Sequence, residues 1–306
     1  MKQILITTSS FGKHDTSMLD SLKEAGFNIT TNPYGRKLTE KEVTELIKEI
    51  KPAGVIAGVE PITESVLKQA NGLKVISRCG IGMDNVNIAA AKKLHIKVKN
   101  TPDGPTRAVA ELVIGLMFSA VRKIVEVDSS IRTGNWYRPM GNLLSMQTVG
   151  LVGCGRIGTA VARTLRLIGS RVIGSDPCFE NHPDIEIVSW DILLEGSDII
   201  SIHIPYSNEA RYLFDLNTIK KMKNGSIIIN TSRGGIVDEK AVFKSIKSGH
   251  LGGACLDCYE EEPYTGELKE LPQVILTSHI GSYAKEARIE MEKQAVSNIL
   301  EVLMEE

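Results

Sequence analysis

Three charged residues of this 306-residue chain stand close after apolar runs, and their types suit proton transfer and anion binding. Arg233 follows SIIINTS, Glu262 comes shortly after GGACLD, and His279 follows QVILTS. A histidine titrates near neutral pH, so it can take the proton of a secondary alcohol while a hydride leaves the carbon. A neighbouring carboxylate would orient the ring and stabilise its protonated form. The planar guanidinium of an arginine could bind a substrate carboxylate and polarise the carbonyl.

Each of these residues also has a purely structural interpretation. A histidine at the end of a strand is often only a hydrogen-bonding residue, Glu262 belongs to an acidic run at 260–262, and Arg233 could simply cap a turn. Catalysis requires the side chains to meet. Parallel strands bring their carboxyl ends to one edge of a sheet, where ligands bind. The catalytic interpretation therefore predicts that Glu262 reaches His279 at that edge.

A glycine-rich segment, VGLVGCGRIGTAVARTL, places Gly153, Gly155 and Gly158 in the spacing G-x-G-x-x-G. The segment follows a strand-like run and opens a helical pattern, which is the context that gives this spacing its meaning. The first glycine permits a tight turn, the second lets a pyrophosphate approach the backbone, and the third lets helix and strand pack closely. The amides of Arg156 and Ile157, at the helix N-terminus, are the expected phosphate donors.

The next apolar run, RVIGSD, ends in Asp176. Its carboxylate would accept hydrogen bonds from the hydroxyls of an adenosine ribose and would repel a 2′-phosphate. Pro177, Cys178 and Phe179 follow it, and no nearby arginine offers compensation. The sequence therefore predicts NAD rather than NADP as the cofactor.

The elements that must position these residues alternate regularly. Short apolar runs are followed by amphipathic stretches, as in GVIAG and TESVLKQA, which is typical of βαβ units and a parallel sheet. A long helix is expected from about residue 106 to 121, after the turn TPDGP, and the alternation restarts at Gln147. The fold class is therefore α/β, with two doubly wound parallel-sheet domains.

The pattern of the C-terminal segment predicts one long helix whose apolar side must pack against another part of the protein. A lone amphipathic helix buries its apolar side against another element. We expect it to return to the N-terminal domain, so that residues 1–100 and 284–306 form one discontinuous substrate domain and residues 101–283 form the NAD-binding domain. The apolar positions expected on one side of the helix are Ile289, Val296, Ile299, Leu300 and Leu303.

Composition argues against several classes of protein. The net charge of −1 gives no basic excess for nucleic acid or an anionic membrane. Apolar runs such as residues 111–121 are about half of the ~20 residues that a membrane span needs. The N-terminus is too short and too strand-like for a signal peptide. Five scattered cysteines suggest reduced thiols in the cytoplasm. Cys255 and Cys258 form a C-x-x-C with no second pair, so we interpret them as small apolar residues and expect no metal site.

Several long motifs in order resemble the D-isomer-specific 2-hydroxyacid dehydrogenase family, from about residue 50 to 290. They are RCGIGMDNVN (78–87), NTPDG (100–104), AVAELVIGLM (108–117), VGLVGCGRIG, IHIP (202–205), INTSRGGIVDEKAV (229–242), GGACLDCYEEEP and SHIGSYAKEA. The resemblance is closest to the D-3-phosphoglycerate dehydrogenase branch, without its regulatory C-terminal domain. It implies a Rossmann NAD domain, a flavodoxin-like substrate domain, and a homodimer in which the helices of residues 101–135 embrace the partner.

The resemblance also implies a role for individual residues. It implies Arg233, Glu262 and His279 as the catalytic set. It implies that Arg78 and the amides near Gly80 and Ile81 bind the substrate. The NAD contacts that it implies, besides the three glycines, are Thr101, Arg156, Ile157, Ile204, Pro205, Asp176, Thr231, Ser232, Asp257 and Gly281.

Two segments depart from the phosphoglycerate branch. The loop NWYRPMGN differs from that branch's basic stretch, although Arg138 could replace part of it, and Tyr283 stands where small residues are usual. The leading hypothesis is an NAD-dependent enzyme that interconverts a small D-2-hydroxy acid and its 2-keto acid, with 3-phosphoglycerate as the first guess. The alternatives are a hydroxypyruvate, glyoxylate or sugar-acid reductase, and an NAD-sensing interaction protein like the family's corepressor members.

Overall fold

The computed structural model describes residues 1–305, which form two compact units. Unit 1 comprises Met1–Pro105 and the chain from Ser282 onward, and unit 2 is Thr106–Gly281. Residues 101–105 and 282–283, which the sequence assigned to the NAD-binding domain, thus belong to unit 1. At Gly104 a side chain would come within 2.5 Å of the Ala287 carbonyl oxygen, so this segment packs directly on the C-terminal helix.

Unit 1 alternates strands with helices, as the sequence pattern predicts. The strand Gly54–Ala57 is buried along its whole length, which is usual for a parallel strand covered by helices on both faces. Thr39 and Glu42 begin the second helix with a reciprocal capping box. The elements are β1 (Gln3–Ile6), α1 (Ser17–Glu24), β2 (Asn28–Thr31), α2 (Glu40–Ile50), β3 (Gly54–Ala57), α3 (Glu64–Lys68), β4 (Val75–Arg78), α4 (Ile88–Lys93), β5 (Lys97–Asn100) and α11 (Lys285–Met304).

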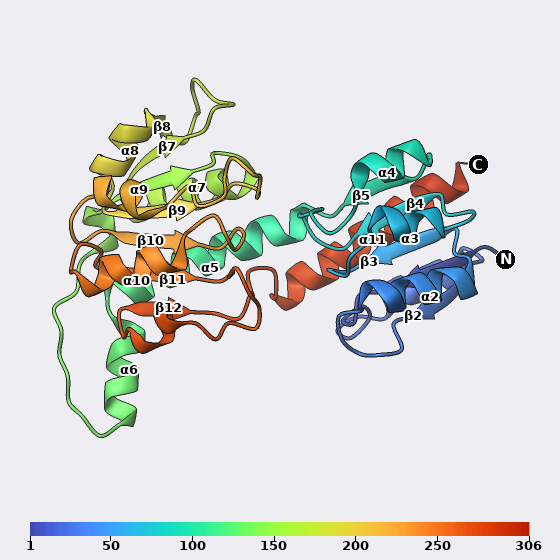
Figure 1. The fold of residues 1–306 in the computed structure, drawn as a ribbon, viewed down its shortest axis with the longest axis horizontal. Coiled ribbons are helices and arrows are strands. Elements are labelled where there is room, and N and C mark those ends of the chain that lie inside the picture. The colour runs from blue at the N-terminus through green and yellow to red at the C-terminus, as the bar shows by residue number, and fades with distance from the viewer. Residues whose placement is uncertain (306) are drawn as a thin grey trace. The chain divides into compact units, whose positions relative to one another are not determined.

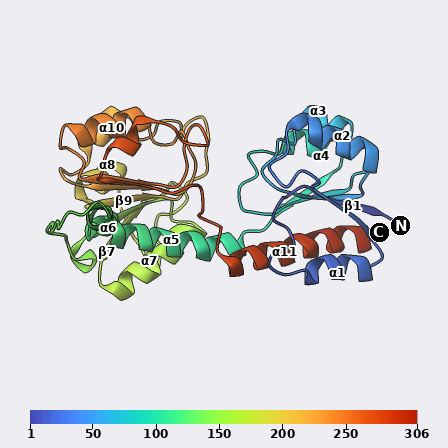
Figure 2. The ribbon, with the colours of Figure 1, turned by 90° about the horizontal axis from the view of Figure 1, so that it is seen from below.

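The sheet of unit 1 has the order β2-β1-β3-β4-β5, with every neighbouring pair parallel. This is the flavodoxin-like order, so the predicted fold class of this unit is confirmed. Helices α2, α3 and α4 cover one face, and α1 and α11 lie together on the other (Figures 1 and 2).

The buried side of α11 differs in part from the expected one. Val296, Ile299 and Leu303 are buried, whereas Ile289 and Leu300 are only partly so. The buried side also carries a charged pair, Arg288 and Glu292. Apolar periodicity could not indicate this pair, because its burial depends on polar partners from the loop after β1. Arg288 donates to the Ser10 hydroxyl, and Glu292 accepts from the Gly12 amide at 3.0 Å.

Unit 2 repeats the alternation with a longer sheet. Strands β9 and β11 are buried along their whole length. The elements are α5 (Asp103–Val121, whose first three residues belong to unit 1), α6 (Ile124–Arg132), β6 (Thr148–Val152), α7 (Arg156–Ile168), β7 (Arg171–Ser175), β8 (Glu186–Ile187), α8 (Trp190–Gly196), β9 (Ile199–Ile202), α9 (Leu216–Lys221), β10 (Ile227–Asn230), α10 (Glu239–Lys247), β11 (Gly253–Leu256) and β12 (Val274–Leu276).

The sheet of unit 2 has the order β12-β11-β10-β9-β6-β7-β8 and is parallel throughout. Counted from β6, the order is 3-2-1-4-5-6 with a seventh strand, which confirms the predicted Rossmann topology. Helices α8, α9 and α10 cover one face, and α5 and α7 cover the other (Figure 2). The sequence pattern missed β8, because an edge strand of two residues shows no periodicity.

Helix α5 begins at Asp103, a little before the expected start near residue 106. An acidic residue and Pro105 in the first turn suit a helix N-terminus. By length and composition alone α5 could cross a membrane. Half of its most apolar stretch is buried, however, and Val113 and Met117 are fully buried in the core of unit 2. A core helix can be as long and as apolar, and the packing of α5 is that of a core helix.

Candidate active site

The glycine-rich loop joins β6 to α7 and needs its glycines for different reasons. Gly153 has a φ of +96°, and a side chain there would lie 2.7 Å from the His203 carbonyl oxygen. A side chain at Gly158 would lie 2.2 Å from the Gly153 carbonyl oxygen. Gly155 caps α7 and has open space around its Cβ position. The outer glycines thus allow backbone packing, and the middle one leaves room for a ligand to approach.

Asp176 stands directly after β7 and is tied to the same loop. Its Oδ2 accepts from the Cys154 amide and its Oδ1 from the Cys178 amide, both at 2.8 Å. Each carboxylate oxygen can accept a second hydrogen bond. The side chain is therefore fixed in place and still able to accept ribose hydroxyls.

Buried polar atoms along the carboxyl edge of the sheet fit a polar ligand. In the part of the chain that the structure describes, Thr231 Oγ1 and His203 Nδ1 are buried without a hydrogen-bond partner. Such atoms are rare in folded proteins and call for a partner. Thr231 follows β10 and His203 follows β9, the strand next to β6. Burial lowers the pKa of His203 to about 4, so the ring is neutral at pH 7. The residues present therefore suit a dinucleotide laid along this edge.

The structure brings His279 and Glu262 together. Nδ1 of His279 lies 2.9 and 3.0 Å from the two carboxylate oxygens of Glu262. Glu262 also accepts from the Tyr259 amide at 3.2 Å. Both side chains remain partly exposed, so the pair faces solvent on one side. Glu262 therefore reaches His279, as the catalytic interpretation predicts.

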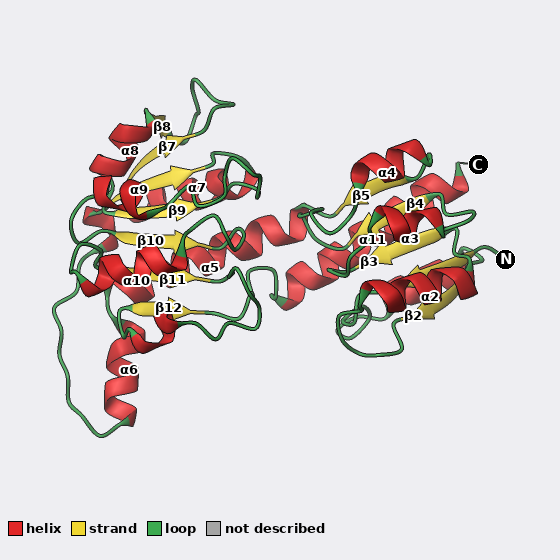
Figure 3. Ribbon diagram, in the orientation of Figure 1, coloured by secondary structure: helices red, strands yellow, loops and turns green. Residues whose placement is uncertain are grey.

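Arg233 lies on the neighbouring loop. Strands β10, β11 and β12 are adjacent and parallel, so the loops after them leave the same edge of the sheet (Figure 3). Nη1 of Arg233 donates to the Ser232 carbonyl at 2.7 Å, and Asn230 Nδ2 donates to the Arg233 carbonyl at 2.8 Å. A side chain at Gly234 would lie 1.8 Å from the Tyr259 carbonyl oxygen. The arginine loop therefore packs backbone to backbone on the loop that carries Glu262.

Asp257 organises the turn that presents His279. Its Oδ1 accepts from the Thr277 hydroxyl at 2.6 Å and from the Ile280 amide at 2.8 Å, and its Oδ2 accepts from the Gly281 amide at 2.8 Å. The carboxylate is buried, and these bonds use most of its accepting capacity. The structure thus gives Asp257 and Gly281, expected as NAD contacts, a positioning role at the histidine turn.

Tyr259 is a residue that the sequence analysis missed. Its hydroxyl lies 2.8 Å from both the Leu256 and the Thr277 carbonyl oxygens, and its ring is buried. It therefore connects the end of β11 to the end of β12, beside Glu262 and His279. The only sequence signal was an aromatic residue between a buried strand and an acidic loop, which is too common to indicate a role.

The remaining cofactor candidates take ordinary positions at strand ends. Ile204 and Pro205 follow β9, and Ser232 donates its hydroxyl to the Ile202 carbonyl at 2.7 Å. Arg156 is the first residue of α7, and Ile157 packs partly on the core below it.

Three of the four candidates in unit 1 contact one another, and the fourth, Ile81, is bonded to Asn100. The Gly80 amide donates to Thr101 Oγ1 at 2.7 Å, and the Thr101 amide donates to the Gly80 carbonyl at 3.1 Å. Arg78 donates to the Cys79 carbonyl and lies against Gly80. The Ile81 carbonyl accepts from Asn100 Nδ2 at 2.8 Å. In this structure the Gly80 amide, expected to bind the substrate, is therefore directed to Thr101, and Thr101 is fully buried.

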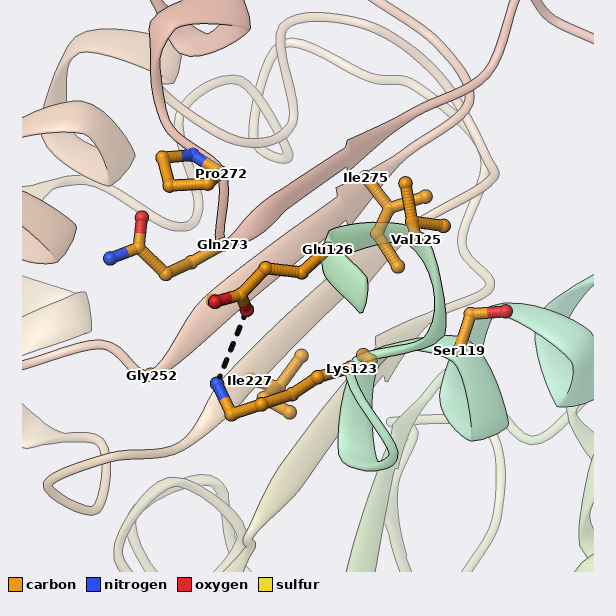
Figure 4. A pocket seen from close by; sticks show the side chains of 11 residues that line it. Ser119, Lys123, Val125, Glu126, Ile227, Gly252, Pro272, Gln273 and Ile275 are labelled. Atoms are coloured by element: carbon orange, nitrogen blue, oxygen red, sulfur yellow. Dashed lines mark ion pairs between the residues drawn. The ribbon is translucent and has the colours of Figure 1, made fainter. Parts of the chain in front are cut away.

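Two cavities of unit 2 differ in their relation to this site. One of about 550 Å³ is lined by Glu262 and His279 together with Tyr264, Leu276 and other neighbours. The other, of about 20 Å³, lies beside Lys123 and Glu126, which form an ion pair of 3.5 Å (Figure 4). It borders the first residues of β10 and β11, at the opposite edge of the sheet, and has room for about one water. Only the larger cavity adjoins the histidine–glutamate pair.

Within residues 1–305 no group of three or more His, Cys, Asp or Glu side chains could hold a metal ion. Cys255 and Cys258 are both buried and free, and burial raises the pKa of the Cys255 thiol to about 12. The C-x-x-C thus supplies two inert core thiols.

Comparisons with known proteins agree with this architecture. A family model described as D-isomer specific 2-hydroxyacid dehydrogenase, NAD binding domain, matches residues 114–281, which is more than half of the chain. The chain is 36% identical over 273 residues to a hydroxypyruvate reductase from Thermotoga maritima, covering 87% of this chain and 89% of the relative. It is 38% identical over 255 residues to a D-3-phosphoglycerate dehydrogenase from Archaeoglobus fulgidus, covering 80% of this chain.

The chain spans about half of that dehydrogenase, 48% of its length. Among solved structures, a protein from Thermus thermophilus superposes with a TM-score of 0.91 at 35% identity, covering 99% of this chain and 97% of the other. The chain therefore belongs to the D-isomer specific 2-hydroxyacid dehydrogenase family. It is an oxidoreductase of that family, and its second unit carries the NAD-binding domain.

Proposed function

We propose that this protein interconverts a short D-2-hydroxy acid and its 2-keto acid, with His279 as the acid–base residue. The observation that carries the proposal is the contact between His279 Nδ1 and both oxygens of Glu262. NAD, when bound, accepts the hydride of the hydroxy acid or, as NADH, returns it to the keto acid.

The two ring nitrogens of His279 have different roles in the proton transfer. The Glu262 carboxylate accepts a hydrogen bond from Nδ1–H of His279. The neutral ring therefore has its free lone pair at Nε2. Nε2 then takes the proton of the substrate hydroxyl during oxidation and returns it to the carbonyl oxygen during reduction. Glu262 stabilises the charged ring that forms in between. Arg233, on the adjoining loop, binds the substrate carboxylate through its planar donors.

For the substrate we favour hydroxypyruvate or glyoxylate over a phosphorylated acid. Arg78, whose guanidinium would suit a substrate phosphate, donates to the Cys79 carbonyl and lies against Gly80. A phosphate would have to draw it away from its own loop. The hydroxypyruvate reductase of Thermotoga maritima also matches over 89% of its length. 3-Phosphoglycerate is the second candidate, and its support is the arginine itself.

The test follows NADH absorbance with hydroxypyruvate, glyoxylate, 3-phosphohydroxypyruvate and larger 2-keto acids. We expect His279→Gln to lower kcat by roughly 10²- to 10⁴-fold, because general acid–base catalysis contributes that much. NADH affinity should stay within about twofold of the parent protein. The matched control is His95→Gln, at an exposed histidine in unit 1.

Unchanged turnover of His279→Gln would remove this residue from the mechanism. A phosphorylated keto acid with the highest kcat/KM would reverse the substrate preference. Firm NADH binding without turnover of any acid would instead favour the NAD-sensing interaction protein.

We also propose that the protein acts as a homodimer through the segment from α5 to the loop before β6. Helix α6 buries none of its residues, although Ile124 and Ile131 lie two turns apart on one side. Beyond α6, Trp136 is 82% and Met140 is 91% exposed. Exposed apolar clusters of this kind mark interaction surfaces. A second copy of the chain is the occupant that the family membership supports.

A further inference from the structure

The loop between β7 and β8 follows Asp176 directly and is fastened to helix α7. Arg163 donates to Asp184 at 2.8 Å, and Arg166 donates to the Pro183 carbonyl at 3.1 Å. These contacts lie at the far end of the loop and are exposed, so each contributes little. A third contact, between His182 and Thr159, is half-buried and lies nearer the glycine-rich loop.

The hydrogen bonds around His182 define which ring nitrogen carries the proton. The Thr159 hydroxyl donates to the Cys154 carbonyl at 3.0 Å, so its only hydrogen is used. Thr159 must therefore accept from His182 Nε2, which lies 3.1 Å away. On the other side of the ring, Nδ1 accepts from the Asp184 amide at 3.1 Å. The ring is thus held as the neutral Nε2–H form, with both nitrogens satisfied.

Through Cys154, these hydrogen bonds connect His182 to Asp176, the carboxylate that we expect to bind the ribose. Cys154 accepts from Thr159 through its carbonyl and donates through its amide to Asp176 Oδ2. The ring of Phe179, on the same loop, packs against His182 edge to face, with centroids 5.4 Å apart, and against the core of unit 2. The imidazole therefore links the loop of Asp176 to the glycine-rich loop at a second point, beyond the contact of Asp176 itself.

We propose that His182 is a positioning residue for the adenosine half of NAD. By donating to Thr159 and accepting from the Asp184 amide, it holds the loop so that Asp176 presents a fixed carboxylate to the ribose. The inference rests on the proposed function only in that the ligand is NAD. It assigns the recognition of the adenosine half to a pair, Asp176 with His182, in place of Asp176 alone.

The test measures binding by titration of the full-length protein with NADH, NADPH and ADP-ribose. We expect His182→Ala to weaken NADH and ADP-ribose in parallel, by about 3- to 10-fold, which is the usual effect of losing one or two hydrogen bonds. The preference for NADH over NADPH should fall as well, because the carboxylate is less firmly placed. At saturating NADH, kcat should stay within about twofold of the parent.

Two conservative variants separate positioning from general support of the fold. Glutamine can place an amide N–H near the position of Nε2, so His182→Gln should recover most of the affinity. Asparagine can replace only Nδ1, so His182→Asn should resemble His182→Ala. At the partner residue, Thr159→Ser keeps both bonds of the hydroxyl and should bind like the parent, and Thr159→Val should weaken NADH as His182→Ala does.

Parent-like affinity and cofactor preference in His182→Ala would overturn the inference. So would a loss of kcat that equals the loss of affinity, or a failure of His182→Gln to recover binding, since both would indicate a structural role only. Absence of NADH binding by the parent protein would overturn it too. Firm NADH binding without turnover of any keto acid would contradict the proposed function and leave the binding comparison decisive for His182.

Discussion

His279, the residue that we propose for acid–base catalysis, has a strained backbone conformation. Its φ is +55°, a left-handed conformation that costs a non-glycine residue about 1 kcal/mol or more. Such a conformation persists only where the surroundings fix it. Here Asp257 binds the amides of both residues that follow, Ile280 and Gly281. The turn therefore holds the ring with Nδ1 on Glu262, and the strain agrees with a positioned acid–base residue.

At the same scale, we propose that Asp176 sets the preference for NADH over NADPH. We expect Asp176→Ala to weaken NADH by about 10-fold or more and to narrow the gap between NADH and NADPH, because both the ribose acceptor and the charge that repels a 2′-phosphate are lost. Steady-state kcat/KM for each cofactor with one keto acid measures this. Asp191→Ala, on the exposed first turn of α8, is the matched control. A parent protein that already prefers NADPH would contradict the argument about the ribose.

The elements of unit 2 converge because its strands are parallel and adjacent. Arg233, Glu262 and His279 come from the loops after β10, β11 and β12, and those strands pair in register side by side. Close backbone packing, without side chains between, then fixes the loops against one another. Gly234 is the clearest case, since its Cβ position lies 1.8 Å from the Tyr259 carbonyl oxygen.

Gly234→Ala should therefore lower activity by displacing the loop of Arg233 from the loop of Glu262. The added methyl group must push the arginine loop away from the loop of Glu262, and a displacement of about 1 Å can cost roughly 10²-fold in rate. We expect kcat/KM to fall by that order, while NADH binding changes less. Gly196→Ala, in α8 with its nearest neighbour at 3.7 Å, should leave activity and melting temperature nearly unchanged. Full activity of Gly234→Ala would mean that the two loops need not pack closely.

At the scale of the whole molecule, the two units have separate cores and carry different candidate site residues. Unit 2 carries the histidine–glutamate pair, the glycine-rich loop and Asp176, and unit 1 carries Arg78, Gly80 and Thr101. Neither set alone provides all the residues that the family resemblance implies. The apolar residues left exposed on and after α6 belong to unit 2 and are the surface we assign to a second copy.

Ile131→Asp should weaken the dimer, because it places a charge in an apolar contact. We expect sedimentation velocity to show a dimer for the parent at micromolar concentration and mainly monomer for the variant. Leu167→Asp is the control, since Leu167 is an apolar residue on α7, outside that segment, and is more exposed than Ile131, 90% against 51%. A monomeric parent, or a variant that stays dimeric, would refute the proposed interface.

The sequence alone determined the two parallel sheets, the glycine-rich turn and the residues at the strand ends. These features follow from local rules: alternating apolar runs, glycines where backbones touch, and polar residues where a buried strand reaches solvent. Only the tertiary structure decided which of those residues meet. Four features depend on contacts between segments that are distant in the sequence. They are the contact of His279 with Glu262, the hydrogen bonds of Asp257 to the histidine turn, the hydrogen bond from the Gly80 amide to Thr101, and the burial of Arg288. Hydrogen bonds form at specific distances and angles, and periodicity along a chain carries no information about them.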